Sequence, residues 1–97
     1  GLVAPIVGHV GDGNFHLIIL LRPDKPDDLQ AANALAETLN LMAIELGGTM
    51  TGEHGVGIGK KKYMQAEHGE AYALMGVIKK AVDPQNIMNP GKMVNVN

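Results

Sequence analysis

Residues 6–21 read IVGHVGDGNFHLIILL, two extended apolar segments around a glycine-rich centre. The Asp12-Gly13 pair at that centre is typical of a two-residue type I′ hairpin turn, because both central residues of such a turn need a positive φ. A turn centred there pairs His9 with His16, and directly opposed residues place their Cβ atoms ~4.5–5.5 Å apart on one face. The spacing therefore predicts either a histidine pair that can hold one divalent metal or a pair with a purely structural role.

The second strand of this hairpin is almost entirely apolar, which predicts that both of its faces are covered. A helix is predicted next, from about residue 26 to residue 46, because apolar residues recur there at spacings of three and four. Acidic residues stand in its first turn and Gly47-Gly48 follows its last, as expected for the two ends of a helix.

A glycine-dense segment covers residues 49–59, and shorter helices are predicted over about 60–66 and 69–82. Asp83-Pro84 ends the last helix, since the residue before proline disfavours helical dihedrals. Two strands followed by helices predict an α+β fold, in which an antiparallel sheet carries helices on one face and an extended C-terminal tail follows.

Composition excludes several functional classes. The 97 residues allow at most one domain, with 45% hydrophobic and 19% charged residues and a net charge of −2. No basic stripe is present, so nucleic acid is not an expected partner. The absence of cysteine excludes disulfides and thiolate metal sites, and no apolar run approaches the ~20 residues that a membrane span needs. The chain begins Gly-Leu-Val-Ala-Pro rather than with methionine, which favours an excised piece of a longer protein.

A second chemical candidate is the stretch GEHGVGIGK over residues 52–60. Two histidines and one carboxylate are a common three-ligand set that leaves a metal position open for substrate. Glu53 would complete such a set with His9 and His16. The neighbouring His54 would stay free for proton transfer, because an imidazole titrates near pH ~6.5. The alternative is that Glu53 and His54 are a solvated loop pair.

Three stretches together resemble a known family: GHVGDGNFH at 8–16, GEHGVG at 52–57, and Asp-Pro followed by NIMNPGK within 83–92. In this order and spacing they are similar to the C-terminal part of FAD-linked oxidases of the vanillyl-alcohol oxidase superfamily. The D-lactate dehydrogenase and glycolate oxidase FAD-subunit types are the most similar. The resemblance implies that residues 1–97 are the C-terminal portion of a ferredoxin-like substrate (cap) domain. It also implies an N-terminal FAD-binding domain that is absent from this chain.

The resemblance further implies a reaction and roles for individual residues. The parent protein would oxidise an (R)-2-hydroxy acid to the 2-oxo acid, with hydride transfer to FAD and assistance from a divalent metal, for which the donors suit Zn or Mn. His9, His16 and Glu53 match the family's metal ligands, His54 matches its catalytic base, and Asn89 matches a contact to the flavin. We expect this chain alone to be inactive and to bind FAD weakly.

One departure from the family bears on the substrate. Family enzymes that act on hydroxyglutarate carry asparagine two residues after the second histidine, where this chain has Ile18. An apolar side chain offers no amide to a distal carboxylate, so a small 2-hydroxy acid such as D-lactate or glycolate is the expected substrate.

The expected partners are this substrate and the protein's own FAD domain, and a homodimer is left open. A cytoplasmic location is expected, with peripheral membrane association of the parent left open. Two other functions compete with this one. The chain could be a free-standing module that binds a metal or small ligand, or an interaction domain without catalysis.

Overall fold

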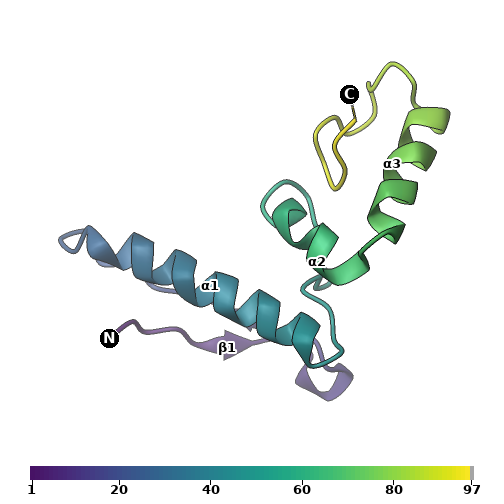
Figure 1. The fold of residues 1–97 in the computed structure, drawn as a ribbon. Helices are drawn as coiled ribbons and strands as arrows, with labels where there is room; N and C mark the ends of the chain where they lie inside the picture. The colour runs from purple at the N-terminus through teal and green to yellow at the C-terminus, as the bar shows by residue number, and fades with distance from the viewer. Residues whose placement is uncertain (97) are drawn as a thin grey trace.

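The computed structural model describes residues 1–96, which form a two-stranded antiparallel hairpin and three α-helices (Figure 1). Strand β1 spans Ile6–Val7 and strand β2 spans His16–Leu17. An isolated bridge between Val3 and Leu20 extends the pairing beyond these strands. The predicted α+β class is confirmed, although the strands are shorter than the apolar runs suggested.

The hairpin register differs from the prediction. Ile6 pairs with Leu17 and Val7 pairs with His16. The predicted pairing of His9 with His16 is therefore wrong, and His9 lies in the connecting loop. Only Gly13 of the central pair has a positive φ, at 77°, so the turn cannot be type I′.

A 3-10 turn replaces the two-residue turn. This turn, η1, spans Val10–Asp12. The His9 carbonyl accepts hydrogen bonds from the amides of Asp12, at 2.9 Å, and Asn14, at 3.1 Å. These bonds pair main-chain groups of the loop with one another.

Helix α1 spans Asp27–Glu45, and Gly47 follows it with a φ of 85°. Ala32 is buried and the next predicted core positions, Ala36, Leu39 and Ala43, are partly buried. These apolar residues, which recur at spacings of three and four, face inward as predicted, whereas Leu29 and Leu46, at the two ends of the same series, are exposed.

The C-terminal half contains a 3-10 turn and two helices. Turn η2 spans Lys61–Tyr63 and leads directly into α2, Met64–His68. Helix α3 spans Ala71–Val82 and ends before Asp83-Pro84, as predicted. Gly69, with a φ of 56°, turns the chain between the two helices.

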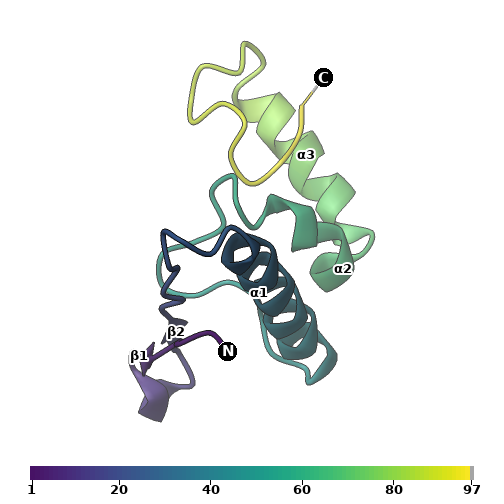
Figure 2. The ribbon, with the colours of Figure 1, turned by 90° about the vertical axis from the view of Figure 1, so that its left-hand side faces the viewer.

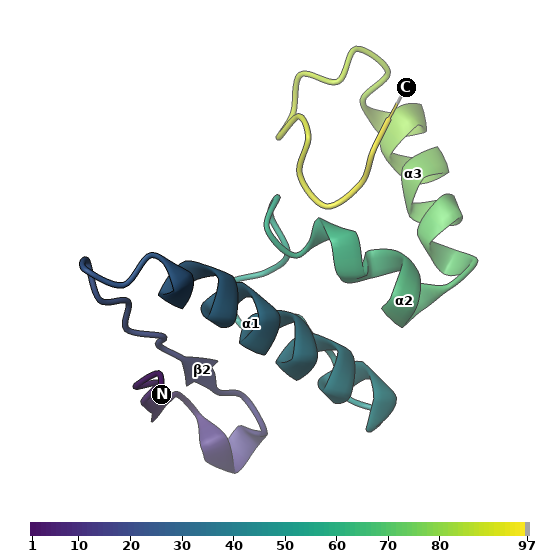
Figure 3. The same cartoon turned by 60° about the vertical axis from the view of Figure 1, so that its left-hand side comes forward.

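The small core lies where α1, α2 and α3 meet. Met50, Tyr63 and Met64 are buried, and four partly buried apolar residues pack against them: Ile44, Val56, Tyr72 and Met75. Figures 2 and 3 show the hairpin along one side of α1 and α2 on its other side, with α3 turned away from the hairpin. The glycine-rich connection between α1 and η2 therefore runs from this core toward the hairpin.

Much of the apolar surface is uncovered. Phe15, Ile18, Leu20 and Leu21, around strand β2, are all exposed. The prediction that both faces of this strand are covered is thus wrong for residues 1–96, because these residues supply a helix for one side of the hairpin only. Across the same residues, none of the helices combines the length and the apolar character needed to cross a bilayer.

Candidate functional site

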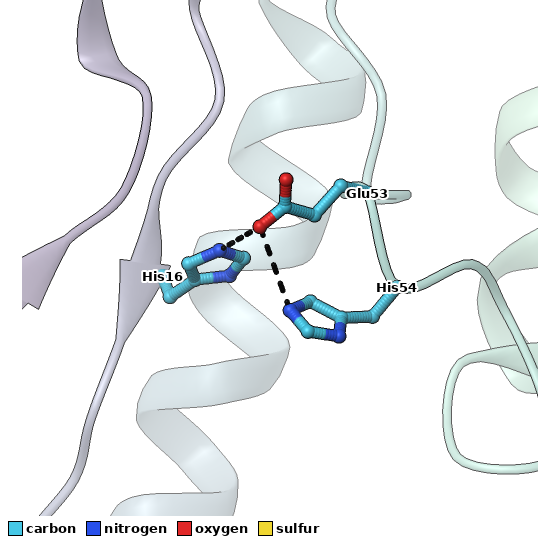
Figure 4. Close-up of side chains that lie close together, drawn as sticks. All are labelled: His16, Glu53 and His54. Atoms are coloured by element: carbon cyan, nitrogen blue, oxygen red, sulfur yellow. Dashed lines mark hydrogen bonds and ion pairs between the residues drawn. The ribbon is translucent and has the colours of Figure 1, made fainter.

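Three ionisable side chains meet between the hairpin and the glycine loop, the name used here for residues 49–60 (Figure 4). His16 comes from β2, while Glu53 and His54 come from the loop. The His16 Nε2 lies 3.0 Å from Glu53 Oε1, and the His54 Nε2 lies 3.6 Å from the same oxygen. The two imidazole rings meet edge to face, with their centroids 5.0 Å apart. One potential ligand atom from each residue lies within 4.8 Å of the others.

His9 reaches the same carboxylate from the η1 side of the hairpin. Its Nε2 lies 3.5 Å from Glu53 Oε2, whereas His16 and His54 lie nearest to Oε1. Three predicted histidines, His9, His16 and His54, therefore converge on Glu53, although His9 reaches it from the loop rather than through strand pairing. The compact set is His16, Glu53 and His54, whereas the sequence predicted His9, His16 and Glu53 as the ligands.

The cluster is exposed to solvent at His9 and His54, the two histidines that lie in loops. The side chains of His54 and His9 are 79% and 66% exposed, that of Glu53 is 46% exposed, and that of His16 is 29% exposed. His16, which lies on strand β2, is the least exposed side chain of the cluster. A ligand can approach from the exposed side without displacing the protein's own side chains.

Two glycines lie where the backbone leaves little room for a side chain near the site. Gly8 has a φ of 140°, and a Cβ there would lie 2.8 Å from the Phe15 Cα and 2.9 Å from the Asn14 carbonyl oxygen. A Cβ on Gly52 would lie 3.2 Å from the Asn14 Oδ1. Gly8 thus allows the two arms of the hairpin to approach each other closely, and Gly52 lies against the side chain of Asn14 in the hairpin.

A C-terminal strap, residues 89–94, holds the far end of the glycine loop. The amide of Met93 donates to the Gly57 carbonyl at 2.8 Å. Lys61 Nζ donates to the Gly91 carbonyl at 3.0 Å, and the Tyr72 hydroxyl donates to the Met93 carbonyl at 3.1 Å. The sequence analysis missed these contacts, which join residues more than twenty positions apart and leave no local pattern.

The cluster borders a groove of about 840 Å³ between the hairpin, α1 and the glycine loop. Its apolar wall comes from α1, through Ala36, Leu39 and Ala43, and its polar residues include His16, Glu53, His54, Asn14, Asn40 and Lys60. A largely apolar concavity with a few converging polar groups is typical of a small-ligand site.

The donor set fits a divalent cation. With metal–ligand distances of ~2.1 Å, tetrahedral ligands stand about 3.4 Å apart. The distances from Glu53 Oε1 to the His16 and His54 nitrogens, 3.0 and 3.6 Å, bracket that spacing, and His9 lies 3.5 Å from the other carboxylate oxygen, outside the compact set. Imidazole and carboxylate donors suit Zn²⁺ and Mn²⁺. The shortest of the three distances is also that of a direct hydrogen bond between His16 and Glu53.

Asn89 lies apart from this cluster, in the turn after α3. Its φ is 48°, and its carbonyl accepts a hydrogen bond from the Lys92 amide at 3.2 Å. The residue is exposed. Its assignment as a flavin contact stays a prediction.

Comparison with known proteins gives consistent matches along the chain. Residues 1–93 match the family described as "FAD linked oxidases, C-terminal domain". The chain is 44% identical over 96 residues to the "Probable D-lactate dehydrogenase, mitochondrial" of Danio rerio, covering 98% of the chain and 19% of that protein. It is 48% identical over 93 residues to "D-lactate dehydrogenase [cytochrome] 1, mitochondrial" of Saccharomyces cerevisiae, covering 95% and 16%.

A bacterial relative gives the same result. The chain is 42% identical over 87 residues to "Glycolate oxidase subunit GlcD" of Bacillus subtilis, covering 89% of the chain and 18% of that protein. The chain thus spans less than one fifth of the length of each of these three relatives. Because the family match covers nearly all of the chain, this protein belongs to the family of C-terminal domains of FAD-linked oxidases.

Proposed function

We propose that this chain forms the metal- and substrate-facing part of an FAD-dependent enzyme that oxidises an (R)-2-hydroxy acid to the corresponding 2-oxo acid. The observation that carries the proposal is the convergence of three imidazoles on the Glu53 carboxylate at the edge of a groove. Family membership supports a flavin-linked oxidation, and relatives are named for D-lactate and glycolate, both small 2-hydroxy acids.

His9, His16 and Glu53 are the proposed ligands of one divalent cation, Zn²⁺ or Mn²⁺. Such a cation supplies Lewis acidity, which makes a substrate hydroxyl more acidic. The two histidines approach different oxygens of Glu53, since His9 Nε2 lies 3.5 Å from Oε2 and His16 Nε2 lies 3.0 Å from Oε1. His16, the least exposed of these side chains, anchors the set on the hairpin.

His54 is the proposed general base. Its Nε2 lies 3.6 Å from Glu53 Oε1, and we propose that this nitrogen carries the ring proton when the base acts. The Nδ1 is then the acceptor for the proton of the substrate hydroxyl. FAD, bound by a separate flavin domain, supplies the acceptor for the hydride that leaves C2 of the substrate. The exposed position of the ring leaves room for substrate beside it.

The remaining assignments extend the same proposal. Residues 1–97 would be the C-terminal portion of the substrate domain, with the flavin domain as their partner and Asn89 as a flavin contact. Ile18, which offers no hydrogen bond, supports a substrate without a second carboxylate. The cytoplasmic location stays a prediction, and the names of two relatives place those proteins in mitochondria.

The experiment is a Zn²⁺ and Mn²⁺ titration of the 97-residue chain by calorimetry, beside single alanine variants of the four site residues. We expect one ion per chain and at least a ~100-fold loss of affinity in Glu53→Ala and His16→Ala, since each removes a direct ligand. His9→Ala should also lose the ion, and His54→Ala should retain it.

The control is Glu37→Ala, because Glu37 is an exposed carboxylate on α1 that lies outside the cluster and the groove. Loss of the ion in His54→Ala but not in His9→Ala would replace the proposed ligand set with His16, Glu53 and His54. Absence of binding in the wild-type chain, and in a longer protein that carries it, would contradict the metal site.

A further inference from the structure

The peptide groups of Met50, at the start of the glycine loop, are held on both sides by charged side chains. The Met50 amide donates to Glu67 Oε1 at 2.7 Å. Its carbonyl accepts a hydrogen bond from Lys60 Nζ, also at 2.7 Å. We propose that Lys60 and Glu67 are positioning residues, which clamp Met50 and thereby place the Glu53 carboxylate and the His54 imidazole. This inference rests on the proposed function of the same cluster.

The clamp belongs to a buried part of the molecule. Met50 is 3% exposed and belongs to the core with Tyr63 and Met64. The Glu67 side chain is 9% exposed, and both of its oxygens have partners, because Oε2 pairs with His68 Nε2 at 2.8 Å. Hydrogen bonds to ionised groups are shorter and about twice as strong as neutral ones. The Met50 peptide is therefore a fixed point of the structure.

Only Thr51 and Gly52 separate this fixed point from Glu53. A segment with so much glycine has many accessible conformations when its ends are free. The hydrogen bond from Met93 to Gly57 holds the other end of the segment. The segment that contains Glu53 and His54 is thus held by hydrogen bonds at both ends, at Met50 and at Gly57. Met50, which Lys60 and Glu67 contact, is the nearer of these two positions to Glu53 in the sequence.

Lys60 also lines the site groove, yet its ammonium group reaches the main chain. Lys62, two residues later, is exposed, and its Nζ lies 5.2 Å from the centroid of the Tyr63 ring. The two lysines carry the same charge but differ in their contact with the loop. They therefore form a matched pair of test and control positions.

The test is a Zn²⁺ titration of the 97-residue chain carrying Lys60→Met, Lys60→Arg, Glu67→Ala or Lys62→Met. Supporting residues around a metal site typically change affinity 10–100-fold, so Lys60→Met and Glu67→Ala should bind at least ~10-fold more weakly. Lys60→Arg retains a cationic donor and should recover most of the loss, and Lys62→Met should bind like the wild type. Substitution of Co²⁺ should give an altered visible spectrum in Lys60→Met, because the ligand geometry changes.

A second measurement needs no metal. Amide hydrogen exchange at residues 51–54 should be faster in Lys60→Met, while protection within α1 and α3 stays unchanged. Wild-type exchange and affinity in both Lys60→Met and Glu67→Ala would overturn the proposal. Loss of the helical circular dichroism signal in Lys60→Met would also contradict it, because a positioning role leaves the helices intact. If the wild-type chain binds no Zn²⁺, the metal proposal fails while the exchange rates still decide the role of the clamp.

Discussion

Gly8 is the position where a single side-chain atom should most disturb the site. Its φ of 140° disfavours any other residue, and a Cβ would lie 2.8 Å from the Phe15 Cα. We expect Gly8→Ala to cost more than ~1 kcal/mol of folding free energy, as substitutions at incompatible glycine positions do, and to weaken Zn²⁺ binding by moving His9 and His16. Thermal unfolding and calorimetric titration check both effects.

Gly11 provides the matched control for this change. It lies in the same loop, and a Cβ there would meet no atom within 4 Å. Gly11→Ala should therefore unfold and bind Zn²⁺ like the wild type. Equal behaviour of the Gly8 and Gly11 variants would show that the close approach at Gly8 is unimportant.

The proximity of four site side chains could be predicted from the sequence, but their arrangement could not, and the roles assigned to them stay predictions. His9, His16, Glu53 and His54 all meet as expected. The predicted pairing of His9 was wrong because the Asp12-Gly13 signal is local, whereas the chain forms a 3-10 turn over Val10–Asp12 that shifts the register of the hairpin. The contacts of Lys60 and Met93 were invisible because each joins residues that are distant in the sequence.

The end of helix α3 is organised by the Asp83 carboxylate. It pairs with Lys79 and accepts hydrogen bonds from the amides of Ile87, at 3.1 Å, and Met88, at 2.9 Å. The Lys79 contact first, and then the amide hydrogen bonds, lower the pKa of Asp83 from 3.8 to about 2. Asp83 thus fastens the turn that leads into the C-terminal strap.

This lowered pKa predicts a pH dependence. Since the folded pKa of Asp83 lies below the unfolded value, its contribution to stability is present above pH 3.8 and is lost as the pH falls toward 2. The pKa of Asp28 is also lowered to about 2, by its hydrogen bonds to Arg22. We therefore expect the melting temperature of the wild-type chain to fall between pH 4 and pH 2.

Asp83→Asn should melt at a lower temperature near neutral pH and show a shallower fall below pH 4. Melting curves followed by circular dichroism provide the measurement. Asp24→Asn makes the same charge change at an exposed position and should keep the wild-type slope. An unchanged slope in Asp83→Asn would rule out the carboxylate as a source of the acid sensitivity.

The helices were easier to predict than the strands. The limits of α1 and α3 follow from local signals, namely apolar spacing, Gly47 after α1 and Pro84 after α3. Strand length depends instead on pairing and on cover from other parts of a protein. The apolar run that follows His16 therefore predicted a longer, covered strand than residues 1–96 form.

The chain as a whole is extended for its size. Its Cα radius of gyration is 15.8 Å, whereas ~12.5 Å is typical of a compact domain of this length. Its accessible surface is 7072 Å², against roughly 5300 Å² for a compact protein of the same mass. Large apolar side chains on α3 contribute to the excess: Leu74, Val77, Ile78 and Val82.

This surface predicts self-association of the isolated chain. Leu74 and Ile78 stand one helical turn apart on α3 and are 59% and 54% exposed, and burial of such side chains contributes ~1.5–3 kcal/mol each. We expect sedimentation to show concentration-dependent dimers or larger species. The double variant Leu74→Gln/Ile78→Gln should weaken the association at least ~10-fold.

Ala73→Gln, also exposed on α3, is the control and should leave the association constant unchanged. A wild-type chain that stays monomeric at every concentration would contradict the prediction. A dimer that persists in the double variant would place the interface elsewhere.

The hydrogen bond between Met93 and Gly57 also has a consequence for biosynthesis. At ~5–20 residues per second, a ribosome needs roughly 2–7 s to proceed from Gly57 to Met93. During that interval His16, Glu53 and His54 already exist, but the strap that holds the glycine loop does not. The nascent protein therefore acquires its histidines and carboxylate before the contact that holds the glycine loop, so binding of a metal at the proposed site should follow the synthesis of Met93 rather than that of the proposed ligands.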